Sequence, residues 1–317
     1  MKGEKVTIHN ISHIAVIGAG LMGHGIAQEF ASAGYHVRLH DVTDEHLQTA
    51  YTQIEKNLKV LAENAIIEKE NIPSTLQRIQ TATELATVAE NADFVVEAVT
   101  ENLPLKQQIF KELDAICPPH TILASNTTAL MPSQIGVNAK RKDKILNTHY
   151  FNPPYLIPLV ELIRSPDTSD ETVSVAFEFL TAIGKTPAII EKEALGFVGP
   201  RLQAALIREA FSIVERGIAS AETVDLVVRN SFGRRLSVAG PFEVFELAGW
   251  DLVLAAFEEL YKDLNSSDDI NPLLRQMVES GKFGVKSKEG FYDWTDEKVQ
   301  ALRDKMNQAL IQQAKDA

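Results

Sequence analysis

The stretch ISHIAVIGAGLMGHGIAQEFASAGYHVRLHD, residues Ile11 to Asp41, predicts the fold of the first half of the chain. An apolar run from Ile14 to Ile17 precedes three glycines, a helical stretch continues to Gly34, and a second short strand covers Val37 to Leu39. Gly34 ends the helix as its C-terminal cap. This order of elements is a β-α-β unit.

Gly18, Gly20 and Gly23 form the pattern GxGxxG directly after a strand and at the start of a helix. In that context the first glycine permits a tight turn, the second lets a pyrophosphate approach the backbone, and the third lets helix and strand pack closely. Asp41 ends the second strand, where an acid accepts ribose hydroxyls and repels a 2′-phosphate. The stretch therefore predicts a site for NAD; an ordinary glycine turn with a surface aspartate is the alternative interpretation.

Strands and helices continue to alternate after this unit. A helix is expected over Glu45 to Ala65, and a polar region follows it. After that region we expect a strand over Phe94 to Val99 with Glu97 in its middle, a helix from Pro104, and a strand in TILASNTTAL. This alternation predicts an α/β fold with a doubly wound parallel sheet, which binds ligands at the carboxyl ends of its strands. Glu101, Ser125 and Asn126 fall at such ends, which favours a functional role over turn chemistry.

The stretch HYFNPPYLIPLVEL, which begins with His149, places Glu161 among aliphatic residues. An ionised carboxylate in such a setting costs several kcal/mol unless it has a partner. A strand from Lys144 runs into His149, the chain turns near Asn152, and a return strand over Leu156 to Ile163 carries Glu161. His149 is therefore the first candidate partner.

A His149–Glu161 pair has a clear chemical use. The carboxylate accepts a hydrogen bond from one ring nitrogen and fixes the tautomer, while the other nitrogen takes a proton from substrate. Beside a nicotinamide, such a base removes the proton of a secondary alcohol as hydride leaves the carbon. Ser125 and Asn126 could then bond the oxygen as it becomes a carbonyl. A buried structural pair without catalytic function is the alternative.

Length and composition set broad limits on the function. A chain of 317 residues suggests two domains, and a net charge of −12 argues against a nucleic-acid partner. We find no apolar run long enough to span a membrane and no apolar core behind the lysines of MKGEKVTIHN, which predicts a cytoplasmic protein. The single cysteine, Cys117, is predicted to be structural, and the histidines have no metal-ligand spacing.

Seven ordered motifs resemble the L-3-hydroxyacyl-CoA dehydrogenase family over nearly the whole chain. They are GAGLMGHGIAQ, FVVEAVTENLPLKQQIF, ILASNTTAL, HYFNPPYLIPLVEL, GFVGPRL, GPFEVFELAG and FGVKSKEGFYDW. The resemblance implies a Rossmann-type, mainly parallel sheet in an NAD-binding domain over residues 1–192. It also implies an all-helical substrate and dimerisation domain over residues 193–317.

The resemblance also implies roles for individual residues. Ser125, His149 and Glu161 match the family's catalytic serine, base and orienting glutamate. The matches to the family's NAD contacts are Gly18, Gly20, Leu21, Met22, Gly23, Asp41, Glu101, Lys106, Ser125 and Asn152.

Three departures from the family bear on the substrate. GFVGPRL has Pro200 where the family has an asparagine that contacts substrate, and a proline has no side-chain amide with which to replace it. NIPSTLQRIQ replaces a lysine-rich stretch of the CoA-bound members. A further amphipathic helix after FYDW, with Val299, Leu302, Met306 and Leu310 on one side, is similar to relatives that oxidise free hydroxy acids, of the gulonate and carnitine dehydrogenase types.

The second domain is expected to be helical and to form a homodimer. Leu202, Leu206, Ala210 and Ile213 share one face of its first helix. Such stripes are usually core, so the dimer depends mainly on the resemblance. Arg234 and Arg235 adjoin the GPFE turn, where a guanidinium could bind a substrate carboxylate; a salt bridge is the alternative.

We therefore expect an NAD-dependent oxidoreductase of fatty acid metabolism that converts an L-3-hydroxyacyl-CoA, first of all 3-hydroxybutyryl-CoA, to its 3-oxo form. The enzymatic alternative is a CoA-independent 3-hydroxy acid dehydrogenase of the L-gulonate or L-carnitine type. The alternative from another class is a crystallin-like protein that binds NAD without turnover.

Overall fold

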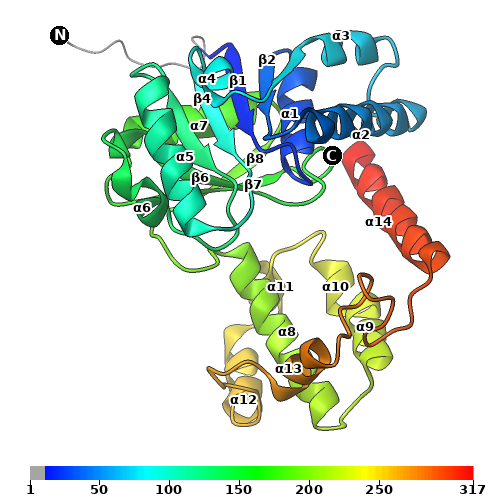
Figure 1. Ribbon diagram of the computed structural model, residues 1–317. Coiled ribbons are helices and arrows are strands. Elements are labelled where there is room, and N and C mark those ends of the chain that lie inside the picture. Colours follow the sequence, from blue (N-terminus) through cyan, green and yellow to red (C-terminus); the bar gives the residue numbers. More distant parts are fainter. Residues whose placement is uncertain (1–10, 317) are drawn as a thin grey trace. The chain divides into compact units, whose positions relative to one another are not determined.

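The computed structural model describes residues 11–316 and divides into two compact units (Figure 1). Unit 1 contains the chain through Pro200 together with the chain from Met306 onward, and unit 2 runs from Arg201 to Lys305. The boundary between residues 192 and 193 stays a prediction beside this division by contacts. The segment MKGEKVTIHN, which was used to predict a cytoplasmic location, lies outside the described residues.

Unit 1 is built on an eight-stranded sheet with the order β3-β2-β1-β4-β5-β6-β7-β8. Its strands are β1 (His13–Ile17), β2 (His36–His40), β3 (Ile79–Ala82), β4 (Phe94–Glu97), β5 (Ile122–Ser125), β6 (Ile145–Tyr150), β7 (Leu159–Arg164) and β8 (Thr186–Ile190). All neighbouring strands pair in parallel except β6 and β7, which are antiparallel. The mainly parallel, doubly wound sheet that the sequence predicts is confirmed.

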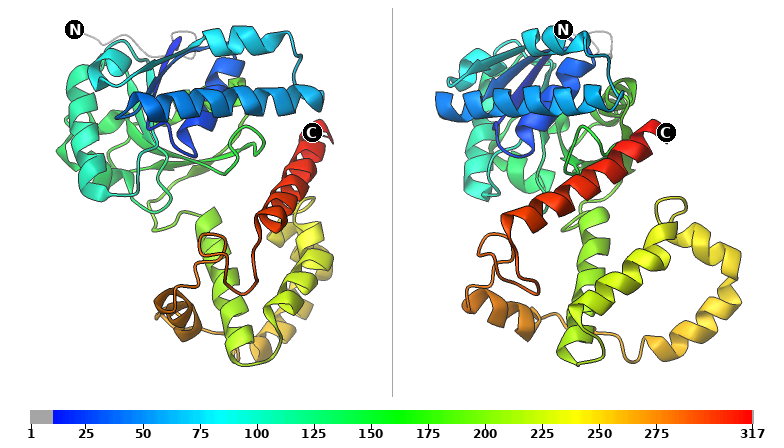
Figure 2. Two further views of the ribbon diagram at one scale, coloured as in Figure 1. Left: turned by 45° about the vertical axis from the view of Figure 1, so that its right-hand side comes forward. Right: turned by 90° about the vertical axis from the view of Figure 1, so that its right-hand side faces the viewer.

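Helices cover both faces of this sheet (Figure 2). The helices of unit 1 are α1 (Gly23–Ser32), α2 (Asp44–Glu63), α3 (Asn71–Gln77), α4 (Leu85–Ala89), α5 (Leu103–Ile116), α6 (Pro132–Ile135) and α7 (Asp170–Ala182). Buried side chains of α1, α2, α3 and α7 form one core cluster with the sheet, and those of α4, α5 and α6 form the other.

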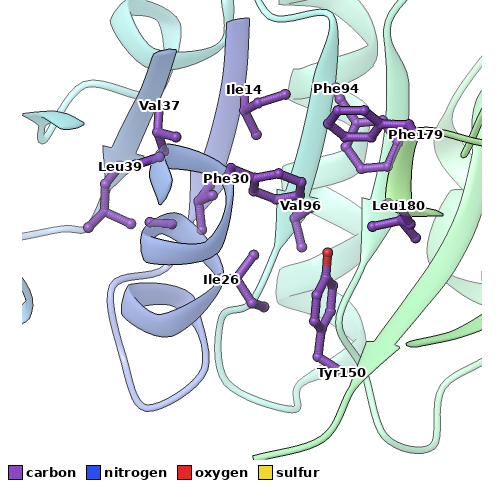
Figure 3. Close-up of a cluster of buried hydrophobic side chains, with 14 of the residues drawn as sticks. Ile14, Ile26, Phe30, Val37, Leu39, Phe94, Val96, Tyr150, Phe179 and Leu180 are labelled. Carbon is purple, nitrogen blue, oxygen red and sulfur yellow. The ribbon is translucent and has the colours of Figure 1, made fainter. Parts of the chain in front are cut away.

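Side-chain alternation in β1 explains these two clusters. Ile14 and Val16 join the first cluster, whereas Ala15 and Ile17 join the second, as expected for a strand buried on both faces. Figure 3 shows the first cluster, in which Phe30 of α1, Phe94 of β4 and Phe179 of α7 meet. The ring centroid of Phe179 lies 5.5 Å from that of Phe30 and 5.1 Å from that of Phe94. This core holds α1 against the sheet.

Two strand boundaries differ from the prediction by two residues or more. Strand β4 ends at Glu97, and not at Val99, because the Val99 N–H donates to the Glu97 carboxylate at 2.7 Å rather than to a neighbouring strand. Strand β7 begins at Leu159, and not at Leu156, because the N–H groups of Leu156 and Ile157 donate to the Pro153 carbonyl in a turn. The polar region after residue 65 contains α3, β3 and α4, which the sequence pattern did not predict.

Unit 2 is helical, as predicted, and no strand occurs among the described residues 201–305. Its helices are α8 (Gly199–Glu215), which starts in unit 1, α9 (Ala221–Asn230), α10 (Phe232–Arg235), α11 (Pro241–Ala248), α12 (Trp250–Leu260) and α13 (Pro272–Glu279). On the predicted face of α8, Leu202 and Leu206 are exposed, whereas Ala210 and Ile213 are half-buried.

Helix α14 (Asp296–Asp316) begins in unit 2 and ends in unit 1. The predicted helix is present; on its apolar side Val299 and Leu310 are half-buried, whereas Leu302 and Met306 are exposed. Only the last turns belong to unit 1, where the buried side chain of Ile311 packs with Leu61 and Leu156. Among residues 11–316, no helix is both long and apolar enough to cross a membrane.

Candidate active site

A cleft of about 770 Å³ lies at the carboxyl ends of four neighbouring strands of unit 1. Its lining residues follow directly after β1, β2, β4 and β5: Gly18, Asp41, Ala98 and Asn126. Polar side chains that follow parallel strands meet at one edge of the sheet, which is where such folds bind ligands. The cleft therefore occupies the position expected for a nucleotide.

The glycine loop has the conformation and the space that a dinucleotide requires. Gly18 has a φ of +100° and lies against Ala98, because a Cβ on Gly18 would be 2.8 Å from the Ala98 carbonyl oxygen. A Cβ on Gly23 would meet the Gly18 carbonyl oxygen, so the loop can close only with glycine there. A Cβ on Gly20 would meet no atom within 4 Å. The chain's own packing does not require glycine at position 20, whereas a bound pyrophosphate would.

Leu21, Met22 and Asp41 also line the cleft. The Asp41 carboxylate accepts hydrogen bonds from the N–H groups of Ala19 and Val42, each at 2.8 Å. His46 Nδ1 lies 2.8 Å from Asp41 Oδ1. Burial favours a raised pKa for Asp41, but these hydrogen bonds together outweigh it and lower the pKa. Asp41 is therefore a carboxylate, as an acceptor of ribose hydroxyls must be.

Glu101 and Lys106, both predicted to contact NAD, have different surroundings. Glu101 lines the cleft, and its carboxylate accepts a hydrogen bond from the Thr127 hydroxyl. Lys106 is fully buried, with Nζ 2.7 Å from Glu97 Oε1 and 3.7 Å from Glu101 Oε2. The Lys106 ammonium thus lies next to Glu101 of the cleft lining but is not itself part of that lining. Its contact with the cofactor stays a prediction.

Ser125 belongs to the same buried network. Glu97 and Ser125 are register partners on β4 and β5, and the Ser125 hydroxyl donates to Glu97 Oε2 at 2.6 Å. Both residues are fully buried. Asn126, one residue later, lines the cleft and accepts the Tyr150 N–H through its side-chain oxygen at 2.9 Å. Glu97 was expected in the middle of its strand, but no sequence pattern predicts its contact with Ser125 on the neighbouring strand.

His149 and Glu161 are register partners on the antiparallel strands β6 and β7, and they are in contact. His149 Nδ1 lies 2.8 Å from Glu161 Oε2, and 7% and 2% of the two side chains are exposed. The rings of Phe151 and Phe197 flank the imidazole, with centroids 4.8 and 5.6 Å from it. The partner that a buried carboxylate at position 161 requires is therefore present.

Glu161 has two further partners. Its Oε1 accepts the N–H groups of Val198 and Gly199 at 3.0 and 2.8 Å. Burial opposes ionisation, but the hydrogen bonds from His149, Gly199 and Val198 lower the pKa of Glu161 overall. Glu161 is thus an anion whose second oxygen, Oε2, accepts the hydrogen bond from His149 Nδ1. Because the anionic Glu161 accepts the proton on His149 Nδ1, the other ring nitrogen, Nε2, carries the lone pair.

The other predicted residues lie on the loop after β6, in the first turn of α8 and in unit 2. Asn152 is exposed on the loop between β6 and β7. The same loop is held by the buried Lys185, whose ammonium donates to the Pro154 carbonyl. Pro200 is the second residue of α8, a position that tolerates proline. Arg234 and Arg235 are exposed in unit 2. Among residues 11–316, no group of three or more potential side-chain ligands is arranged for a metal ion.

Comparisons with known proteins agree with the motifs. Residues 13–194 match the model of the 3-hydroxyacyl-CoA dehydrogenase NAD-binding domain, and residues 196–294 match that of its C-terminal domain. The chain is 38% identical over 287 residues to a probable 3-hydroxybutyryl-CoA dehydrogenase of Bacillus subtilis, covering 90% of this chain and 98% of that protein.

Two solved structures are also similar. One is a 5-formyl-3-hydroxy-2-methylpyridine 4-carboxylic acid 5-dehydrogenase, an NAD⁺-dependent dismutase, with a TM-score of 0.89, 30% identity and coverage of 95% of this chain and 96% of that one. The other is the (S)-3-hydroxybutyryl-CoA dehydrogenase of Ralstonia eutropha, with a TM-score of 0.76, 32% identity and coverage of 90% and 100%.

Proposed function

Because this chain belongs to the 3-hydroxyacyl-CoA dehydrogenase family of NAD-dependent oxidoreductases, we propose that it oxidises the 3-hydroxyl group of a short-chain L-3-hydroxyacyl-CoA to the 3-oxo group. 3-Hydroxybutyryl-CoA is the first candidate substrate. The observation that carries this proposal is the buried contact of 2.8 Å between His149 Nδ1 and Glu161 Oε2. An imidazole held in this way has one nitrogen free for a substrate proton.

His149 is the proposed base. Glu161 accepts the Nδ1 proton, so Nε2 carries the lone pair that takes the hydroxyl proton of the substrate. The hydrogen on C3 leaves as hydride in the same oxidation, and NAD supplies the hydride acceptor. The imidazolium that results is stabilised by the anionic Glu161. In the reverse direction the same imidazolium returns its proton to the carbonyl oxygen.

The glycine loop, Asp41 and Glu101 are proposed to bind NAD. Support comes from the open space at Gly20, from the carboxylate of Asp41 at the end of β2, and from the exposure of Glu101 to the same cleft. Lys106 is proposed to act indirectly, through Glu101, because its ammonium is fully buried. Asn152 is proposed to add a contact from the loop after β6.

Ser125 and Asn126 are proposed to position the substrate oxygen or the nicotinamide. The Ser125 proton is donated to Glu97, so its oxygen can accept a further hydrogen bond where it stands. Donation to a carbonyl oxygen would require the hydroxyl to turn away from Glu97. We therefore propose the acceptor role for Ser125 in the resting site.

A free hydroxy acid is the second candidate substrate. The dehydrogenase with a TM-score of 0.89 carries a pyridine carboxylic acid, and not a CoA thioester, in its name. Pro200 also stands where the family has an asparagine that contacts substrate. For such a substrate, Arg234 or Arg235 is the proposed partner of the carboxylate.

We also propose a cytoplasmic homodimer that acts in fatty acid metabolism. Support for the dimer comes from unit 2, where large apolar side chains are exposed on several helices. They include Leu202, Leu206, Val227, Phe242, Leu247 and Leu254. Apolar area of this kind is favourable to bury against a second copy.

The deciding experiment compares initial rates of NAD reduction with L-3-hydroxybutyryl-CoA, free L-3-hydroxybutyrate, L-gulonate and L-carnitine. Turnover of the thioester alone is the expected result. Turnover of a free acid alone would replace the first candidate by the second. If none of the four is oxidised and NAD still binds in calorimetry, the proposal for these substrates is overturned.

A further inference from the structure

His46 is a cleft residue that neither the motifs nor the proposed reaction uses. It lies in the first turn of α2, where its N–H donates to the Thr43 hydroxyl that caps the helix. Its ring Nδ1 lies 2.8 Å from Asp41 Oδ1, and 59% of its side chain is exposed. It lines the same cleft as Asp41 and the glycine loop. His46 is thus placed beside the carboxylate that binds ribose in the proposed cofactor site.

The hydrogen bonds that Asp41 already accepts leave it too few acceptor positions for both hydroxyl groups of a ribose. A carboxylate offers about four acceptor positions in all, two on each oxygen. Three of these are occupied, because Oδ1 faces the Val42 N–H and His46 Nδ1, and Oδ2 faces the Ala19 N–H. One position remains, whereas the ribose of NAD presents two hydroxyl groups. The second hydroxyl needs another acceptor.

We infer that His46 contacts the 2′ position of the adenosine ribose and makes the cleft's exclusion of a 2′-phosphate dependent on pH. The neutral ring donates its Nδ1 proton to Asp41, so Nε2 accepts a hydrogen bond from the 2′-hydroxyl. The protonated ring has an N–H at both nitrogens. It then compensates the charge of Asp41 and donates to a 2′-phosphate through Nε2.

Other ionisable groups in the cleft limit the size of this effect. They are His40, Glu45 and Glu101. The two glutamates repel a phosphate at any pH near neutrality, so protonation of His46 gives tolerance of NADP and not a preference for it. His40 does not replace His46 as the cation, because burial lowers the pKa of His40 more than Asp41 and the other nearby groups raise it.

The inference rests on the proposed cofactor site and is tested by binding alone. Calorimetry without substrate gives the Kd of NADP and of NAD at pH 6 and pH 8 for the wild type, His46→Leu and His120→Leu. His120 forms a similar pair with Asp93, at 3.0 Å, away from the cleft lining, and is the matched control. The comparison with His46→Leu is required because a phosphate itself loses charge near pH 6, which opposes the effect of His46.

At pH 6, the wild type and His120→Leu are expected to bind NADP about tenfold more tightly than His46→Leu, the contribution of one charge-assisted hydrogen bond. At pH 8 this advantage disappears. An equal pH dependence of the NADP Kd in His46→Leu and the wild type would overturn the inference. Failure of all three proteins to bind NAD would instead overturn the proposed cofactor site.

Discussion

Unit 1 contains two histidine–carboxylate pairs with the same separation and opposite surroundings. His46 Nδ1 and His149 Nδ1 each lie 2.8 Å from a carboxylate oxygen. In the His46–Asp41 pair 59% and 16% of the side chains are exposed, whereas in the His149–Glu161 pair only 7% and 2% are. Distance alone therefore says little about what such a pair does.

Burial explains the difference between the two pairs. The rings of Phe151 and Phe197 flank the nearly buried His149, and Glu161 accepts two backbone N–H groups besides its contact with the imidazole. A pair in this environment keeps one geometry, as acid–base catalysis requires. An exposed ion pair contributes only about 0 to 1 kcal/mol and can reorient towards a ligand. The buried pair thus suits proton transfer, and the open pair suits recognition.

Replacement of His149 tests the buried pair most directly. His149→Gln removes the base and should lower kcat by about 10³-fold, within the range of general base catalysis. The affinity for NAD, measured by calorimetry, should change little, because the cleft lining does not include His149. The matched control is His120→Gln at the His120–Asp93 pair, for which kcat should equal that of the wild type. Equal kcat values for His149→Gln and the control would contradict the assignment.

Glu161→Gln keeps the shape of the side chain and changes the tautomer of His149. The N–H groups of Val198 and Gly199 require an oxygen at their position, so the amide nitrogen of Glu161→Gln would face His149 Nδ1. The ring proton would then move to Nε2, where it blocks the base. We expect kcat to fall by about 10²-fold, as for loss of a strong charge-assisted hydrogen bond.

Two kinetic comparisons check this reading of Glu161. The double variant Glu161→Gln with His149→Gln should be no slower than His149→Gln alone, because both changes act on one base. Asp93→Asn makes the corresponding carboxylate-to-amide exchange in the His120–Asp93 pair and should leave kcat unchanged. A further loss in the double variant would indicate that Glu161 acts on something other than His149.

The buried network of Glu97, Lys106 and Ser125 allows a smaller test. If Glu97 acts by directing the Ser125 hydroxyl, Glu97→Gln and Ser125→Ala should each lower kcat/KM about tenfold, and the double variant should lose no more than Ser125→Ala. Ser125→Thr keeps a hydroxyl and should restore part of the rate. Thermal unfolding of each variant separates loss of positioning from loss of folded protein, because Glu97→Gln leaves the buried Lys106 without its anion. Additive losses would assign Glu97 a structural role.

The same comparison shows which parts of the site could be predicted from sequence. The glycine loop and Asp41 are local to one β-α-β unit, so their spacing predicts their position. His149 and Glu161 are only twelve residues apart in the chain, and a turn followed by a return strand is enough to pair them. Local pattern and short-range pairing carry enough information for both.

Contacts between segments that are distant in the sequence could not be predicted from it. The backbone donors to Glu161 lie 37 and 38 residues away, and no pattern identifies them. The burial of Lys106 against Glu97 depends on the packing of α5 on β4, so its ammonium could not be placed from a motif. His46 carried only a weak signal, its position five residues after Asp41 on the first turn of a helix. The residues that support the site were therefore missed more often than the residues proposed to perform the chemistry.

The smallest expected effect belongs to the open pair. At pH 8, His46→Leu should weaken NAD binding about fivefold, because one neutral hydrogen bond to the ribose contributes about 1 kcal/mol. His46→Gln keeps an acceptor oxygen and should recover part of that loss. ADP-ribose contains the adenosine ribose but no nicotinamide, so it should show the same loss as NAD in calorimetry. A loss seen for NAD and absent for ADP-ribose would move the contact of His46 away from the adenosine end. The open pair would then have no part in recognising the adenosine ribose, and exposure alone would not distinguish a recognition pair from an incidental one.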